Sequence, residues 1–234
     1  MRGSPPTPSS AGGTPGTGDR RFSTRVVRAA YDMVATDYTV AFGDDLAGLP
    51  VDRAMLDAAA DRVADGGLVL DLGCGPAPVS GYLTARGARA IGADVSGGML
   101  SAARSRNPGL AIVQADMRCL SFRTGSLGLV VAYYSIQHLP RGQLAAALDE
   151  IGRVVGSDGA LLLATHLGDG DVYIDEFLGH RIEPLGGALY QRDELLAHLD
   201  AAGFVIDAEE HREPLSHEAE THRIYILARR PAQP

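Results

Sequence analysis

Short apolar runs alternate with amphipathic stretches along most of this chain. Runs typical of buried strands occupy residues 68–72, 88–94, 110–116, 127–134 and 159–167. Between several of them apolar side chains recur at helical spacing, as in residues 141–155. Two further apolar runs, FVIDAEE and RIYILARR, follow a helical segment near the C-terminus. Strands that alternate with helices of about a dozen residues predict an α/β fold with a mostly parallel sheet and helices on both faces.

The pattern also predicts the domain organisation. Residues 1–20 are rich in Pro, Gly, Ser and Thr and cannot bury enough apolar surface to offset the entropy of ordering, so we expect a disordered tail. Residues 21–234 should form a single domain. Its first part, residues 21–66, is expected to be a helical cap, with a second helix running from Pro50 to the glycines at 66–67.

Residues 166–190 form an insert between the fifth strand and the next helix. The insert is too long and too mixed in composition for a plain connection, so we expect a lid or a wall of an acceptor site. Its acidic residues are interpreted as an exposed acidic loop, and we expect no metal site. They are Asp169, Asp171, Asp175 and Glu176.

Composition narrows the function classes. The hydrophobic fraction of 45% and the charged fraction of 21% are ordinary for a globular protein. A net charge of −8 disfavours a nucleic-acid partner. The chain has no lysine, which excludes Schiff-base chemistry, and its two cysteines favour a reduced, cytoplasmic setting. No apolar run approaches the ~20 residues that cross a bilayer, so no membrane partner is expected.

The most informative stretch is VLDLGCGPAPVS, residues 69–80. Asp71 ends the first strand, and Gly73 and Gly75 allow the backbone to approach a ligand closely. A dinucleotide site would require a third glycine where Pro78 stands, and a phosphate-binding loop would require a lysine. An acid beside the glycines suits the ammonium group of an amino-acid moiety better than a phosphate. A nicotinamide dehydrogenase is therefore the weaker alternative.

Acids also end the second and third strands. The position of Asp94 suits a carboxylate that accepts hydrogen bonds from both ribose hydroxyls. Each such charge-assisted bond contributes roughly 1.5–3 kcal/mol. Asp116 could accept from an adenine amino group while Met117 lies against the ring. The alternatives are that Asp94 favours a helix N-terminus capped by Ser96, and that Asp116 is simply a polar strand end.

Five segments, in order, resemble the class I S-adenosylmethionine-dependent methyltransferases: DLGCG, IGADVSGGML, QADM, LVVAYYSIQHLP and GRVVGSDGALLLATHLG. AAYDMVATDY resembles the helix that closes over the cofactor, and RIYILARR the last strand. The resemblance covers roughly residues 28 to 230 and is closest to small-molecule enzymes of quinone biosynthesis and secondary metabolism. It implies a Rossmann-like seven-stranded sheet of order 3-2-1-4-5-7-6 with strand 7 antiparallel. Ala77 stands where the family has its third glycine.

The resemblance implies that the cofactor is S-adenosylmethionine, with S-adenosylhomocysteine as its product. The residues expected to line it are Tyr31, Tyr38, Asp71, Gly73, Cys74, Gly75, Asp94, Val95, Met99, Asp116, Met117 and Tyr133. For Cys74 and Met99 packing in the core is an equally open role. Tyr31 and Tyr38 lie seven residues apart and could share a core-facing helical surface.

The implied reaction is a metal-independent, in-line transfer of the methyl group to an O, N or C nucleophile of a small molecule. Candidate bases are His138, His166 and His180. Enzymes that methylate amino groups of nucleic acids carry [DN]PP[YF] where AYYS stands here. Two alternatives remain, namely an S-adenosylmethionine-binding protein or sensor without transfer activity, and a protein or peptide methyltransferase. The acceptor, the need for a base and the oligomeric state are left open.

Overall fold

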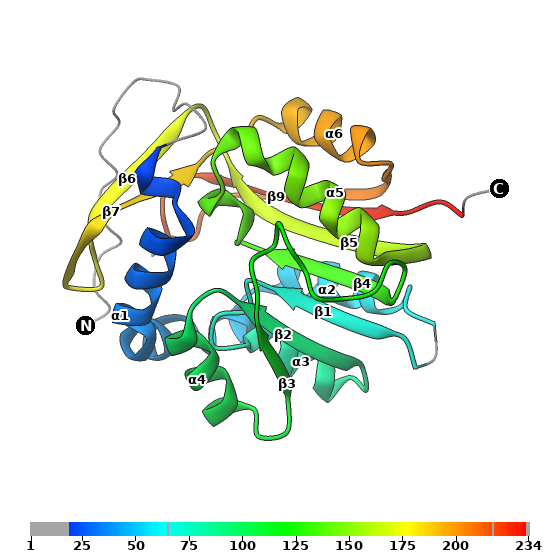
Figure 1. Ribbon diagram of the computed structural model, residues 1–234, viewed down its shortest axis with the longest axis horizontal. Coiled ribbons are helices and arrows are strands. Elements are labelled where there is room, and N and C mark those ends of the chain that lie inside the picture. Colours follow the sequence, from blue (N-terminus) through cyan, green and yellow to red (C-terminus); the bar gives the residue numbers. More distant parts are fainter. Residues whose placement is uncertain (1–18, 65, 217, 233–234) are drawn as a thin grey trace.

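The computed structural model describes residues 19–64, 66–216 and 218–232. The expected disordered tail lies outside these residues apart from its last two positions. A seven-stranded sheet of order β3-β2-β1-β4-β5-β9-β8 forms the centre (Figure 1). Its strands are β1 (Leu68–Leu72), β2 (Arg89–Asp94), β3 (Ala111–Gln114), β4 (Leu127–Tyr133), β5 (Val155–Leu167), β8 (Val205–Arg212) and β9 (His222–Arg229).

The sheet confirms the predicted fold. Strands β1 to β5 pair in parallel, and β9 is antiparallel to both of its neighbours, β5 and β8. The order matches the expected one once the strands outside this sheet are set aside. Strand β5 begins at Val155 rather than at residue 159, because Leu127 of β4 already pairs with Val155 before a register shift.

The helices are α1 (Thr24–Phe42), α2 (Pro50–Ala60), α3 (Pro78–Ala85), α4 (Gly97–Arg106), α5 (Leu144–Val154) and α6 (Arg192–Ala201). Helix α2 ends earlier than the predicted glycines at 66–67. Beyond Ala60 the backbone turns tighter, because the N–H groups of Arg62 and Val63 bond three residues back instead of four. None of the described helices combines the length and the apolarity that a membrane span needs.

Alternate side chains of the strands build a core on each face of the sheet. Leu70, Val130 and Leu163 pack on the face that α5 and α6 cover. Val69 and Leu162 pack on the opposite face, against α2 and α3. Each such side chain stabilises the fold by roughly 1.5–3 kcal/mol. Both layers are visible in Figure 1. With both faces covered, polar side chains can gather only where the strands end.

Helix α1 and a β-hairpin lie together at the carboxyl ends of the parallel strands (Figure 1). The hairpin consists of β6 (Asp171–Phe177) and β7 (His180–Ala188), so the expected insert is a two-stranded antiparallel sheet. Val26 and Val27 of α1 pack against Leu185 of the hairpin. Arg25 and Glu183 add an exposed ion pair of 2.7 Å. Helix and hairpin therefore form one cover over this end of the sheet.

Candidate functional site

The glycine loop after β1 is held close to two neighbouring strand ends. Gly73 and Gly75 have φ angles of 79° and 53°. The Gly73 N–H donates to the Ala93 carbonyl at 2.7 Å. A Cβ added at Gly73 would lie 2.3 Å from Ser135 Cβ, so only glycine fits there. Ala77, at the family's third glycine, adopts the left-handed conformation with φ 61° that a glycine favours. The turn therefore keeps its shape despite the substitution.

Asp71 ties the end of β1 to the first turn of α3. Its Oδ2 accepts from the Ser80 N–H at 2.9 Å and from Ser80 Oγ at 2.6 Å. The side chain is 1% exposed, and burial raises the pKa of its carboxyl to about 6. Asp71 thus stabilises the glycine loop between β1 and α3.

Asp94 lies beside the same loop, at the end of β2. Its two oxygens accept from the Gly75 N–H at 2.9 Å and the Ser96 N–H at 2.8 Å. Burial raises the pKa of this carboxyl too. Within the described residues neither Asp71 nor Asp94 forms an ion pair. A buried carboxylate at Asp71 and a partly buried one at Asp94, both without an ion-pair partner, suit a ligand that brings positive charge and hydroxyl donors, which fits S-adenosylmethionine.

Two tyrosines of α1 close the space above Asp94. The rings of Tyr31 and Tyr38 meet edge to face at 5.7 Å, and Phe177 of the hairpin joins both. A Cβ on Gly75 would lie 4.0 Å from the Tyr38 ring. Burial, with the nearby Asp94 charge, raises the pKa of Tyr38 to about 12. The structure therefore brings Tyr38 to the glycine loop and packs Tyr31 against Tyr38.

Asp32 holds α1 in this place, and sequence reasoning missed it. Its Oδ1 accepts from Ser96 Oγ at 2.6 Å and from the Gly98 N–H at 2.8 Å. It thus satisfies donors at the N-terminus of α4, where negative charge is stabilised. Ser96 was recognisable as a helix cap, but no local signal points to a partner 64 residues away.

Asp116 is engaged by protein groups. Its carboxylate accepts from Arg118 Nε at 2.8 Å and from Thr24 Oγ1 at 3.0 Å, and the Arg118 contacts lower its pKa. Met117 packs against the core. A cavity of about 250 Å³ opens beside this group and is lined by Phe22, Thr24, Arg118 and other residues. An adenine amino group at Asp116 would share the carboxylate with these partners.

Three further predicted cofactor residues bury their side chains in apolar clusters. Cys74 packs with Leu100 and Ala103 of α4. Met99 is 1% exposed and packs under α1. Val95 packs against the helix–hairpin contact. The side chains of these residues therefore pack in the interior and support the loops.

His138 follows β4 and bonds to α1. Its Nε2 lies 2.8 Å from Tyr31 Oη, and its Nδ1 lies 2.9 Å from the Gly186 carbonyl of the hairpin. A carbonyl can only accept, so Nδ1 carries the proton and Nε2 of the neutral ring accepts from Tyr31. Burial lowers the pKa of His138, which keeps the imidazole neutral.

The other two histidines have different surroundings. His166, at the end of β5, lies 2.7 Å from Thr221 Oγ1, and its ring is 5.0 Å from that of Tyr134. Burial and the Arg223 charge lower its pKa to about 4. His180 instead bonds to Asp37 at 2.8 Å, on the exposed side of α1. The structure thus separates His180 from the other two candidate bases, and the charge of His138 also lowers the pKa of His166.

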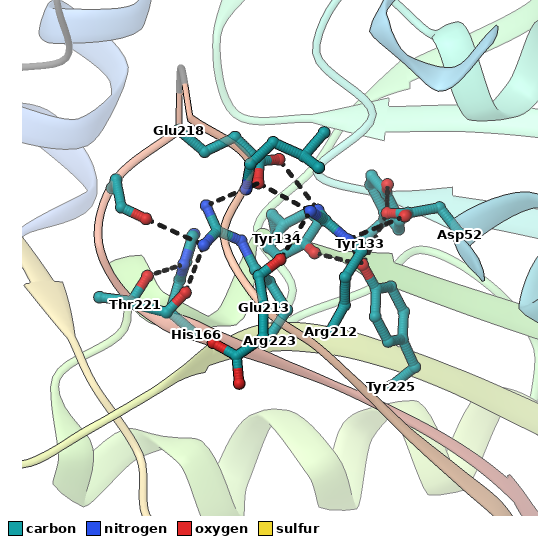
Figure 2. A network of polar contacts seen from close by, with 12 residues as sticks. Asp52, Tyr133, Tyr134, His166, Arg212, Glu213, Glu218, Thr221, Arg223 and Tyr225 are labelled. Carbon is teal, nitrogen blue, oxygen red and sulfur yellow. Dashed lines mark hydrogen bonds and ion pairs between the residues drawn. The ribbon is translucent and has the colours of Figure 1, made fainter. Parts of the chain in front are cut away.

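Tyr133, whose backbone was predicted to line the methionine end, donates its hydroxyl proton to the buried Asp52 (Figure 2). Its backbone remains at the end of β4. Among the residues that the structure describes, no three His, Cys, Asp or Glu side chains are grouped as metal ligands would be.

Comparison with known proteins supports the interpretation of the chain as a methyltransferase. The family described as "Methyltransferase domain" matches residues 69–159. A demethylmenaquinone methyltransferase of Beutenbergia cavernae is 32% identical over 142 residues, 59% of this chain and 57% of that protein. A trans-aconitate 2-methyltransferase of Methylobacterium nodulans is 39% identical over 95 residues, 40% of this chain and 36% of that protein. The chain thus spans little more than half the length of the first relative.

The fold has solved counterparts. The 1,6-didemethyltoxoflavin-N1-methyltransferase of Burkholderia thailandensis superposes with a TM-score of 0.67 at 16% identity, over 96% of this chain and 94% of that one. This likeness concerns the fold alone. Motifs, sheet order and matched domain agree, and together they support a class I S-adenosylmethionine-dependent methyltransferase.

Proposed function

We propose that this chain transfers the methyl group of S-adenosylmethionine to an O, N or C nucleophile of a small molecule. The observation that supports this most is the buried carboxylate of Asp71 and the partly buried one of Asp94 beside the glycine loop, neither of which forms an ion pair within the described residues. The ligand that compensates such a site carries positive charge, as the ammonium and sulfonium groups of S-adenosylmethionine do.

The roles of the residues follow from their positions. When bound, S-adenosylmethionine supplies a methyl group that is already activated by the charge on sulfur. Asp94 binds the ribose hydroxyls, and the Gly73–Gly75 backbone holds the methionine part. Tyr31 and Tyr38 cover the cofactor and exclude water from the reacting centre. Catalysis then comes mainly from proximity and alignment, for which effective molarities reach ~10⁵ M and above. We expect no metal.

His138 is the proposed base for an acceptor that arrives protonated. Its Nε2 is unprotonated in the neutral ring, and the Gly186 carbonyl fixes that tautomer. The Tyr31 hydroxyl lies 2.8 Å from Nε2 and occupies it. The acceptor proton therefore passes to Nε2 directly once Tyr31 has moved, or it passes to the Tyr31 oxygen while Tyr31 gives its own proton to Nε2. General-base catalysis of this kind contributes typically 10²–10⁴-fold.

A small-molecule acceptor agrees with the names of the similar proteins. Demethylmenaquinone and trans-aconitate are small molecules, and the Burkholderia enzyme was crystallised with 1,6-didemethyltoxoflavin and S-adenosylhomocysteine. The acidic net charge of −8 supports an acceptor other than nucleic acid.

Binding is tested first, by calorimetry of the chain with S-adenosylhomocysteine and, separately, with NAD. We expect the chain to bind S-adenosylhomocysteine and not NAD. In the Asp94→Asn variant the affinity for S-adenosylhomocysteine should fall roughly 10- to 100-fold, equivalent to one or two charge-assisted bonds. Asp57→Asn is the matched control, because Asp57 bonds Tyr82 at the surface. A preference for NAD would overturn the assignment.

Transfer is tested with methyl-labelled S-adenosylmethionine and a cell extract separated by molecular size. Label in the small-molecule fraction, absent with Asp94→Asn, supports the proposed reaction. Label on macromolecules alone would indicate a protein or peptide substrate. Binding without label in any extract or acceptor pool would favour a sensor.

A further inference from the structure

A buried polar network joins α2 to the carboxyl end of β4 (Figure 2). Asp52 of α2 is fully buried. Its Oδ1 accepts from the Tyr133 hydroxyl and, at 2.8 Å, from Tyr225 Oη. Its Oδ2 lies 3.3 Å from Arg212 Nε. Tyr134 Oη in turn lies 2.8 Å from Tyr225 Oη. A chain of two hydroxyls therefore runs from Tyr134 to a buried carboxylate.

The chain has one direction. A carboxylate only accepts, so the single proton of the Tyr225 hydroxyl points to Asp52. Arg212 Nε also donates to Tyr225 Oη, at 3.1 Å. Tyr225 therefore has no proton left for Tyr134, and Tyr134 must donate its own to Tyr225. Toward any further partner, Tyr134 Oη then offers only lone pairs.

Tyr134 lies directly beside the residue that contacts the glycine loop of the proposed site. It directly follows β4, has a φ of 49°, and precedes Ser135, the residue against which the Gly73 loop packs. It is half-buried, and its ring faces that of His166 at 5.0 Å. Strained backbone of this kind is typical of functional sites and persists because surrounding contacts hold it.

The positive charges of this network are already paired. Arg212 contacts Asp52 and makes a 2.7 Å ion pair with Glu218. Arg223 lies 3.4 Å from Glu218 and donates to the Ala219 carbonyl at 2.9 Å. An acceptor carboxylate or phosphate at Tyr134 would therefore compete with Asp52 and Glu218 for these arginines.

We propose that Tyr134 is a specificity-determining residue of the acceptor site and that Asp52, through Tyr225, is the positioning residue that fixes its hydroxyl. The site then selects acceptors that bring an uncharged O–H or N–H group to Tyr134 Oη. It rejects carboxylates and phosphates, whose oxygens would meet lone pairs there. That the selected molecule is a methyl acceptor rests on the proposed function, but the selection itself is measurable by binding.

The test uses the chain saturated with S-adenosylhomocysteine and four matched probes, namely phenol, aniline, benzoate and phenyl phosphate. Ligand-observed NMR gives their affinities. We expect phenol and aniline to bind at least ~10-fold more tightly than the two anions. The anions place a charged oxygen against the lone pairs of Tyr134 Oη and so lack the hydrogen bond that phenol and aniline form there. In Tyr225→Phe, Tyr134 is free to donate, and the preference should fall below ~3-fold. Tyr134→Phe, which keeps the half-buried ring, should do the same.

Tyr82→Phe is the matched control, because Tyr82 of α3 donates its hydroxyl proton to Asp57 of α2 at 2.7 Å, and neither residue belongs to this network. It should keep the wild-type preference. The inference is overturned if the wild type binds the anions as well as phenol, if it binds none of the probes, or if Tyr134→Phe and any folded Tyr225→Phe behave like Tyr82→Phe.

Labelled transfer to the same probes separates this inference from the proposed function. Label on benzoate in preference to phenol would overturn the inference and support a methyltransferase. The expected binding preference together with no label on any acceptor would support the inference and count against transfer.

Discussion

Tyr31 Oη lies 2.8 Å from His138 Nε2, although 107 residues separate the two in the chain. Tyr31 belongs to the covering helix and His138 to the loop after β4, so this bond joins the cover to the sheet. The Tyr31 and His138 rings also meet edge to face, with their centroids 5.3 Å apart. The position of α1 and the orientation of the proposed base therefore depend on the same contact.

Changing either partner of this bond should affect transfer more than binding. Tyr31→Phe keeps the ring and leaves His138 Nε2 without its donor, and His138→Gln removes the base. We expect S-adenosylhomocysteine affinity within ~3-fold of wild type and a fall of roughly 10²-fold in kcat/KM for His138→Gln. His180→Gln, which loses the exposed bond to Asp37, is the control. Equal losses in all three variants would contradict the role of His138.

Asp71 predicts a pH dependence of stability. Its pKa is raised by burial from the ordinary value of 3.8 to about 6, so the native state favours the protonated form. Its contribution is fully present below pH 3.8 and is lost as the pH rises through 6. Relative to wild type, Asp71→Asn should therefore gain up to about 3 kcal/mol in free energy of unfolding between pH 4 and pH 7.5.

Asp116→Asn provides a control of opposite sign. The pKa of Asp116 is lowered by Arg118, so its contribution is present above pH 3.8 and is lost as the pH falls. Urea unfolding of the three proteins across this pH range measures both effects. Parallel stability curves for wild type and Asp71→Asn would contradict the buried-carboxylate interpretation.

Gly73 should tolerate no side chain. Its φ is 79°, and an added Cβ would lie 2.3 Å from Ser135 Cβ. Gly73→Ala should destabilise the fold by about 1–3 kcal/mol and weaken S-adenosylhomocysteine binding by displacing the loop after β4. At Gly97 an added Cβ meets no atom within 4 Å, so Gly97→Ala should be close to neutral. Thermal unfolding with and without S-adenosylhomocysteine distinguishes the two variants.

Asp32 should stabilise the closed position of α1. Asp32→Ala leaves donors at the N-terminus of α4 unsatisfied, which costs about 0.5–2 kcal/mol. We also expect faster dissociation of S-adenosylhomocysteine, measured by stopped flow, since α1 covers the site. Arg25→Ala breaks an exposed ion pair between the same cover elements and should have little effect. An unchanged dissociation rate in Asp32→Ala would show that α1 is held by other contacts.

Several features of the site were readable from the sequence. Gly73 and Gly75 follow β1 and Asp94 ends β2, so parallel pairing brings all three to one edge of the sheet, while their contacts with the cofactor stay predictions. Ala77 stands where the family has its third glycine, and it adopts the left-handed conformation that a glycine favours. Surrounding packing thus determines the turn at this position, since Ala77 is fully buried.

Side-chain partners were the part that sequence patterns could not supply. Cys74 and Met99 lie in the expected segments, but packing directs their side chains into apolar clusters. Asp52 reads as an ordinary first-turn acid of α2, and only the fold reveals it as the buried end of a hydroxyl chain.

The sequence by itself determined the order of elements, the covered sheet and the acids at the strand ends. Periodicity and glycine spacing are local properties, and parallel topology converts them into positions. Only the tertiary structure decided which of three histidines meets Tyr31, where the hairpin packs and which way the hydroxyl of Tyr134 points. Those outcomes depend on contacts between segments far apart in the chain, such as Asp52 with Tyr225, 173 residues away. Such contacts leave no periodic trace in one sequence, because each partner is chosen by packing and by the need to satisfy buried polar groups.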